Sequence, residues 1–258
     1  MANFSTYFIA GLTLGCVCLG ILIGGLLRGL LPKHHLSKSS QDLIKSAAGL
    51  MATLVALIIG LLVSSAKGTF DSANSGIAQV GAKAIALDRV LKRYGPETKE
   101  SRDLLQKHVQ VSIQRFASSE SNASEDDAAI EAAAGIESIH DKIRDLKPKT
   151  DEQRQLQTQA LQISEETLTA LLQLLEQSQS DLPTFFVIVL IAWLAALFMS
   201  FGMLAPGHAT AYGALLVCAV SISCAVFLIL ELNRPLQGAI QVSIVPLQKA
   251  ASMMRKSL

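Results

Sequence analysis

The sequence lacks the motifs that covalent chemistry requires. It has no glycine-rich phosphate-binding loop, no Gly-x-Ser-x-Gly turn and no pair of cysteine or histidine residues at a metal-ligand spacing. The acidic run Glu125-Asp126-Asp127 lacks the alternating oxygen ligands and the glycine of a calcium loop. We therefore expect no enzymatic activity, no catalytic residue, no cofactor and no metal site.

Histidine and cysteine are also scarce, with five and four residues. His34-His35 follows Pro32-Lys33, which predicts a solvated basic loop. His108 and His140 lie among charged residues, so we expect them on solvent-facing helix surfaces. All four cysteines fall within apolar stretches and say nothing about a redox compartment: Cys16, Cys18, Cys218 and Cys224.

Four long apolar stretches dominate what the sequence does contain. Each reaches or exceeds the roughly 20 residues that an α-helix needs to cross a bilayer. No Lys or Arg precedes Arg28, so the first stretch lacks the basic start of a signal peptide and is expected to remain as a span. The sequence predicts a polytopic membrane protein with spans at Phe4–Leu31, Ala47–Ala66, Pro183–Leu204 and Ala211–Leu230.

No ionised side chain lies in the middle of these stretches. Proton-coupled transporters and pumps need intramembrane Asp, Glu, His or Lys residues. Active transport is therefore disfavoured. A passive pore and a membrane anchor for a soluble region both remain possible.

Small residues recur every four positions in the spans. Such ridges let helix backbones approach closely in lipid, where hydrophobicity does not draw helices together. The motif is compatible with packing within one chain and with packing between copies in a homo-oligomer, and it does not separate the two. The candidate packing residues of the first span are Gly11, Gly15, Gly20, Gly24, Gly25 and Gly29.

The polar insert at residues 67–181 carries a net charge of −5, whereas the rest of the chain carries +6. An acidic insert beside basic membrane-flanking segments indicates lipid as a partner and argues against nucleic acid. Apolar residues recur at heptad spacing over Phe70–Tyr94, which predicts a helix continuous with the second span. Gly95-Pro96 should end that helix, Ser118–Asp127 should form a loop, and Thr150 should cap the last helix of the insert.

The expected fold class is all-α, with four transmembrane helices arranged two and two around the helical insert. The expected organisation is a first transmembrane hairpin at 1–66, an extramembrane bundle at 67–181, a second hairpin at 182–231 and a juxtamembrane segment at 232–258.

Several blocks of the sequence resemble a bacterial membrane family described by a bestrophin-like domain. They are Leu87–Leu91 and Tyr94–Lys99 in the insert, Phe201-Gly202 with Ala205-Pro206, and Ile229–Asn233 with Pro235 and Gly238. Relatives usually carry Asp at the position of Asn233. The motif residues are Asp88, Arg89, Tyr94, Gly95, Pro96, Glu231, Pro235 and Gly238.

The resemblance implies kinship with bestrophins, which are anion channels that assemble as pentamers around a pore lined by the second membrane helix. On this analogy the chain is a homo-oligomer that conducts inorganic ions. The alternative is a membrane-anchored interaction or sensory module without transport. The implied pore-lining residues are Thr53, Leu57, Gly60, Ser64 and Lys67, although Thr and Ser could instead bond their own helix carbonyls in a packed helix.

The distribution of basic residues bears on orientation. None precedes the first span, whereas Arg28, Lys33, Lys38 and Lys45 flank the first hairpin loop. By the positive-inside rule, we expect a multi-pass protein of the bacterial inner membrane with both hairpin loops in the cytoplasm. The insert and the termini would then lie outside it.

Overall fold

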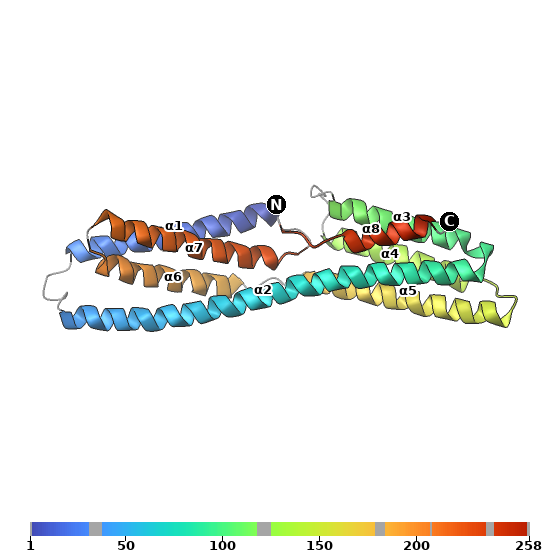
Figure 1. Ribbon diagram of the computed structural model, residues 1–258, viewed down its shortest axis with the longest axis horizontal. Coiled ribbons are helices and arrows are strands. Elements are labelled where there is room, and N and C mark those ends of the chain that lie inside the picture. The colour runs from blue at the N-terminus through green and yellow to red at the C-terminus, as the bar shows by residue number, and fades with distance from the viewer. Residues whose placement is uncertain are drawn as a thin grey trace. The chain divides into compact units, whose positions relative to one another are not determined.

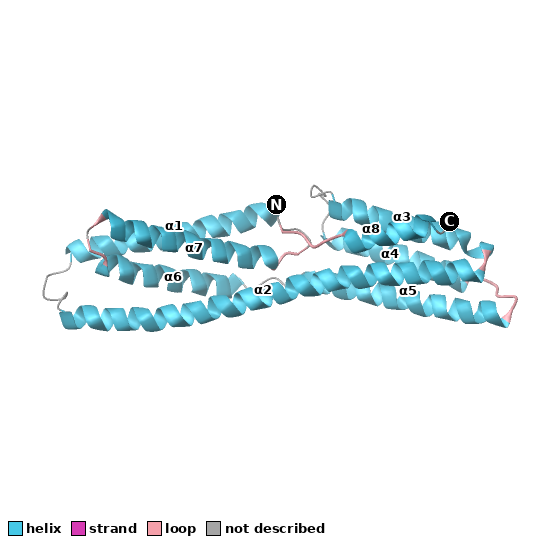
Figure 2. Ribbon diagram, in the orientation of Figure 1, coloured by secondary structure: helices cyan, strands magenta, loops and turns pink. Residues whose placement is uncertain are grey.

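The computed structural model of the chain describes residues 2–30, 38–117, 125–178, 184–206, 208–235 and 240–256. Within these ranges every element of regular secondary structure is a helix, as Figure 2 shows. Four helices are long and apolar enough to cross a membrane. The predicted all-α fold class with four spans is confirmed.

Two of the spans precede the insert and two follow it. Helix α1 (Ala2–Leu30) and helix α2 (Lys38–Tyr94) come first, and helices α6 (Thr184–Leu204) and α7 (Ala209–Leu232) come last. Helix α2 has 57 residues, so it is about 85 Å long at 1.5 Å per residue. The prediction that the second span continues unbroken to Tyr94 is confirmed.

The chain divides into two compact units. Figure 1 colours the chain by residue number. The first comprises Met1–Thr69 and Asp181–Ile240. In it α1 packs along α6 and α7, and α2 contributes Val55 to the common core. The other core residues are Val17, Ile21, Leu190, Leu194, Phe198, Ala219 and Val226.

The second unit comprises Phe70–Ser180 and Gln241–Leu258. The end of α2, the short 3-10 helix η1 (Pro96–Thr98), α3 (Lys99–Ala117), α4 (Glu125–Arg144), α5 (Asp151–Ser178) and α8 (Val245–Lys256) form it. Its core includes Leu87, Leu91, Leu105, Ile139 and Ile143. Helix α8 adds Ala250 and Met254 to this core. Part of the predicted juxtamembrane segment at 232–258 therefore belongs to the helical bundle.

The turn after α2 depends on a glycine. Gly95 has φ of 132°, a backbone conformation that only glycine adopts without strain. The Thr98 hydroxyl donates hydrogen bonds to the carbonyl oxygens of Leu91 at 2.6 Å and Gly95 at 2.8 Å. The buried hydroxyl therefore ties the turn to the end of α2, and the Gly95 carbonyl also accepts from the Thr98 amide at 3.3 Å.

The helix starts of the insert agree with the sequence in one case and differ in the other. The Thr150 hydroxyl accepts a hydrogen bond from the Gln153 amide at 3.1 Å, so the predicted cap of α5 is confirmed. The prediction of a loop over Ser118–Asp127 is wrong for residues 125–127, because α4 begins at Glu125. Carboxylates are favourable in a first helical turn, where the helix dipole is positive. Residues 118–124 lie outside the described ranges.

Candidate functional site

One face of the membrane-spanning part of α2 is open in the single chain. The five residues that the sequence singled out on this face are all exposed: Thr53, Leu57, Gly60, Ser64 and Lys67. Only 11% of the apolar window of α2 is buried, whereas the windows of the other three spans are 22–28% buried. Helix α2 is therefore the span that the rest of its own chain covers least.

The chemistry of this face is weakly polar. The Thr53 hydroxyl donates to the carbonyl oxygens of Leu50 at 2.7 Å and Gly49 at 3.2 Å, so it is satisfied within its own helix. A β-carbon at Gly60 would meet no heavy atom within 4 Å. Lys67 is the charged residue among these five. The face offers no set of strong ligands.

The glycines of α1 lie in two different environments. A β-carbon at Gly20 would lie 2.6 Å from the carbonyl oxygen of Ala195, and one at Gly24 would collide with the backbone of Met199. The close approach also depends on a glycine of α6, because a β-carbon at Gly202 would collide with the carbonyl oxygen of Ile21. These glycines allow α1 and α6 to approach within one chain. Gly25 faces the Tyr212 hydroxyl, whereas Gly11, Gly15 and Gly29 have open space beside them.

The motif residues of the insert hold the corner between α2 and α3. The carboxylate of Asp88 accepts a hydrogen bond from Arg102 Nε at 2.8 Å, and their side chains are only 6% and 12% exposed. Arg89, the next residue, is exposed. The Asp88–Arg102 ion pair therefore fixes the geometry of the bundle and is not available to a ligand.

Tyr94 closes the same corner. Its hydroxyl is buried and has no hydrogen-bond partner among the described residues. Burial raises the pKa of this phenol, and the nearby Glu97 carboxylate raises it further. The Gln153 side chain donates to the Tyr94 carbonyl oxygen at 3.2 Å, which links α5 to the end of α2.

The motif residues at the end of α7 are also buried. Glu231 is 1% exposed and Asn233 is 5% exposed. Pro235 is fully buried, and Gly238 lies outside the described residues. Composition and spacing alone do not indicate a buried carboxylate at the end of a span. Glu231 was singled out by the family resemblance.

The prediction that His108 and His140 lie on solvent-facing surfaces is wrong for both. The His108 ring occupies the space that a β-carbon at Gly135 would fill. His140 Nδ1 lies 2.7 Å from the hydroxyl oxygen of the fully buried Ser164. Both rings are half-buried between helices, which flanking charges in the sequence did not indicate. His34 and His35 lie outside the described residues.

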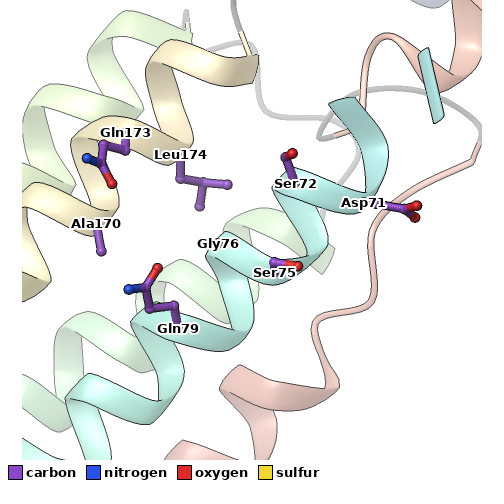
Figure 3. Close-up of a pocket in the computed structure, with 8 residues that line it drawn as sticks. All are labelled: Asp71, Ser72, Ser75, Gly76, Gln79, Ala170, Gln173 and Leu174. Carbon is purple, nitrogen blue, oxygen red and sulfur yellow. The ribbon is translucent and has the colours of Figure 1, made fainter. Parts of the chain in front are cut away.

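A groove of about 360 Å³ lies between α2 and α5 in the second unit. Figure 3 shows it, with Leu174 directed toward Gly76 and Ser72, and Asp71 directed away from α5. The remaining lining residues are Ser75, Gln79, Ala170 and Gln173. The groove offers hydroxyl and amide groups but no catalytic arrangement. No cluster of three metal-ligating side chains occurs within the described ranges.

A family model for the Bestrophin-like domain matches residues 15–247. No functionally curated protein matches the sequence significantly. Among solved structures, the chain is similar to a crystal structure of a bacterial bestrophin homologue from Klebsiella pneumoniae with a single substitution, at a TM-score of 0.65 and 13% identity. That match covers 95% of this chain and 98% of the other.

A second substituted form of the same Klebsiella protein matches at a TM-score of 0.63 and 14% identity, over 98% of each chain. At this identity the likeness shows the fold. The family model, which covers most of the sequence, shows the relationship and confirms the resemblance seen in the motifs. The chain belongs to the Bestrophin-like family of membrane proteins.

Proposed function

We propose that the protein is a homo-oligomeric passive ion channel of the bacterial cytoplasmic membrane, with α2 lining its pore. The observation that carries this proposal is the exposure of α2. This span is covered least by its own chain, and its open face bears Thr53, Gly60 and Ser64. The family membership and the fold support the same assignment.

Assembly around α2 has a physical rationale. Lipid tails solvate leucine well, but small and hydroxyl-bearing residues gain more from contact with another helix or with water. In a ring of copies, the Leu54 and Leu61 side of α2 would contact neighbouring helices or lipid, and the Thr53 side would face the axis. Both sides are exposed in one chain, so both are available.

Lys67 indicates the class of permeating ion. It follows the apolar stretch of α2 at the end nearer the insert. A ring of ammonium groups at a pore mouth would raise the local concentration of anions and repel cations. The other lining residues, Leu57, Gly60 and Ser64, are neutral and bind ions weakly. Weak binding suits conduction, because an ion must also leave.

Flux through reconstituted liposomes tests the proposal. Ser64→Phe should block salt-gradient flux, because a bulky ring would fill a narrow apolar pore. Ser221→Phe is a matched control, since Ser221 is an exposed serine on α7 and bonds only its own helix carbonyl in the structure. Lys67→Glu should shift the reversal potential in a chloride gradient toward cation selectivity.

The alternative is an anchored interaction or sensory module. Undetectable flux of chloride, potassium and sodium from a protein that is oligomeric by native mass would exclude the channel. Equal loss of flux in Ser64→Phe and Ser221→Phe would exclude α2 as the lining helix. A monomer by native mass in mild detergent would exclude the pore between copies.

We also propose that the insert and termini lie outside the cytoplasm. The first span has no basic residue before it, whereas Arg28, Lys33, Lys38 and Lys45 flank the first hairpin loop. A reporter fused within residues 118–124 should therefore be active only in a form that reports export. Activity of a cytoplasmic reporter at the same site would reverse this orientation.

A further inference from the structure

The groove between α2 and α5 in the second unit has an apolar floor. A β-carbon at Gly76 would lie 2.9 Å from Cδ1 of Leu174, so the glycine leaves the space that this leucine fills. Leu174 is 3% exposed and Ala170 is 5% exposed. The two helices therefore touch at the bottom of the groove, and its volume of about 360 Å³ lies on the solvent side of that contact.

Polar side chains form the walls of the groove. Ser72, Ser75 and Gln79 come from α2, Gln173 comes from α5, and all four are exposed. Figure 3 shows the two glutamines on facing walls. Each amide offers two donor hydrogens and a carbonyl acceptor, and each hydroxyl both donates and accepts. Within the described part of the chain no hydrogen bond engages these four side chains, so their bonding capacity is available to a ligand.

The walls of the groove present no free charge. Asp71 is the charged residue among those that line it, but its carboxylate is directed away from α5 and already has an interaction partner. None of the described lining residues is a cation. One turn beyond Gln79, Lys83 donates to Glu166 of α5 at 2.6 Å, so these two charges neutralise each other and join the helices. The groove is therefore poorly suited to anionic and to cationic ligands.

We propose that this groove binds a small neutral polyol from solution, of the size of one sugar ring. A hydroxyl group donates and accepts at once, so neighbouring hydroxyls of a ring match the donor and the acceptor of a glutamine amide without any charge. The C–H face of the ring would lie on Leu174 and Ala170. Ligand pockets typically measure about 300–1,000 Å³, and a groove at the lower end holds a single ring. The site does not depend on conduction by the spans.

Saturation-transfer NMR on the full-length protein in nanodiscs tests the proposal. The discs contain phosphatidylcholine, whose headgroup has no hydroxyl group, and maltoside detergent is removed because its headgroup is itself a sugar. D-glucose and myo-inositol are the neutral probes, and glucose 6-phosphate and choline are the charged comparators. Both neutral probes should receive saturation that levels off with concentration, and both charged compounds should receive several-fold less.

Three variants locate the binding. Ser72→Phe fills the groove from the exposed side of α2 and should abolish saturation transfer to glucose. Gln173→Ala should weaken glucose binding about fivefold, as expected for the loss of one hydrogen bond. Gln155→Ala is the matched control, because Gln155 is another exposed glutamine of α5 and lies outside the groove, and it should leave binding unchanged. Circular dichroism verifies that each variant remains helical.

Four results would overturn the proposal. Neither neutral probe may receive saturation from the wild-type protein, or the signal may rise linearly with concentration without levelling off. Ser72→Phe may retain full binding, which would place the sugar elsewhere on the protein. Glucose 6-phosphate or choline may bind as well as glucose, which contradicts a neutral site. Gln155→Ala and Gln173→Ala may have equal effects, which would show that the groove amide is not a ligand.

Discussion

Replacing Asp88 with Ala should destabilise the second unit strongly, because it leaves the Arg102 guanidinium buried without its ion-pair partner. The two side chains are 6% and 12% exposed, and Nε lies 2.8 Å from the carboxylate. Breaking a buried pair by removing one partner typically costs about 3–5 kcal/mol of unfolding free energy. Because the stability of a domain is itself only about 5–15 kcal/mol, the change should be large in any unfolding assay.

An exposed pair in the same unit gives the matched comparison. Asp141 pairs with Arg144 at 2.9 Å, but their side chains are 61% and 65% exposed. Solvent screening limits such a pair to about 0–1 kcal/mol, so Asp141→Ala should change stability little. The two variants remove the same functional group at a similar distance from its partner. The pairs differ in burial, and also in that Asp88–Arg102 joins two helices whereas Asp141–Arg144 lies within one helix.

Denaturant unfolding in detergent, followed by circular dichroism, measures both variants. Hydrogen exchange of α2 and α3 peptides then locates the loss. The double variant Asp88→Leu with Arg102→Met should recover much of the stability, since apolar residues of similar volume can replace a buried ion pair. The reasoning is refuted if Asp88→Ala and Asp141→Ala have the same stability within about 1 kcal/mol.

Two further predictions concern close packing and charge. Gly24→Ala should lower the unfolding free energy by about 1–3 kcal/mol, since its β-carbon would collide with the backbone of Met199. Gly29→Ala should be neutral or stabilising, because no heavy atom lies within 4 Å of its β-carbon position. Thermal unfolding in detergent compares the two variants, and equal midpoints would contradict the α1–α6 contact. The hydrogen bond from Lys83 at 2.6 Å lowers the pKa of Glu166, so its contribution should be present above 4.5 and lost as pH falls through the folded pKa. Stability curves of wild type and Glu166→Gln should therefore converge on acidification, and parallel curves would show that the pair contributes nothing.

Residue spacing predicted much of the fold because it reports local geometry. The heptad repeat of Phe70–Tyr94 and the absence of a breaker before Gly95 were enough to predict a single helix from the second span into the insert. Thr150 and Gln153 predicted a helix start, because a cap needs only residues three apart. The end of the loop at 118–127 was misplaced, since acidic residues suit both a loop and a first helical turn.

The sites depended on contacts that spacing does not encode. The glycines of α1 follow one four-residue pattern, yet Gly20 and Gly24 face α6 and Gly11 and Gly15 face open space. The signal that could have found the histidine contact was Gly135, a glycine inside a strong helical pattern. Its partner was not identifiable, because His108 lies on another helix.

The sequence by itself determined that the chain crosses a membrane as helices, because length and apolarity alone satisfy a bilayer without reference to partners. Its motifs also determined the family. Only the tertiary structure decided which small residues are enclosed within the chain, which ion pair is buried and which histidines touch a helix backbone. Those properties depend on the rotation of each helix about its axis relative to its neighbours. That rotation is set by the packing of side chains distant in sequence, and so it appears only in the folded chain.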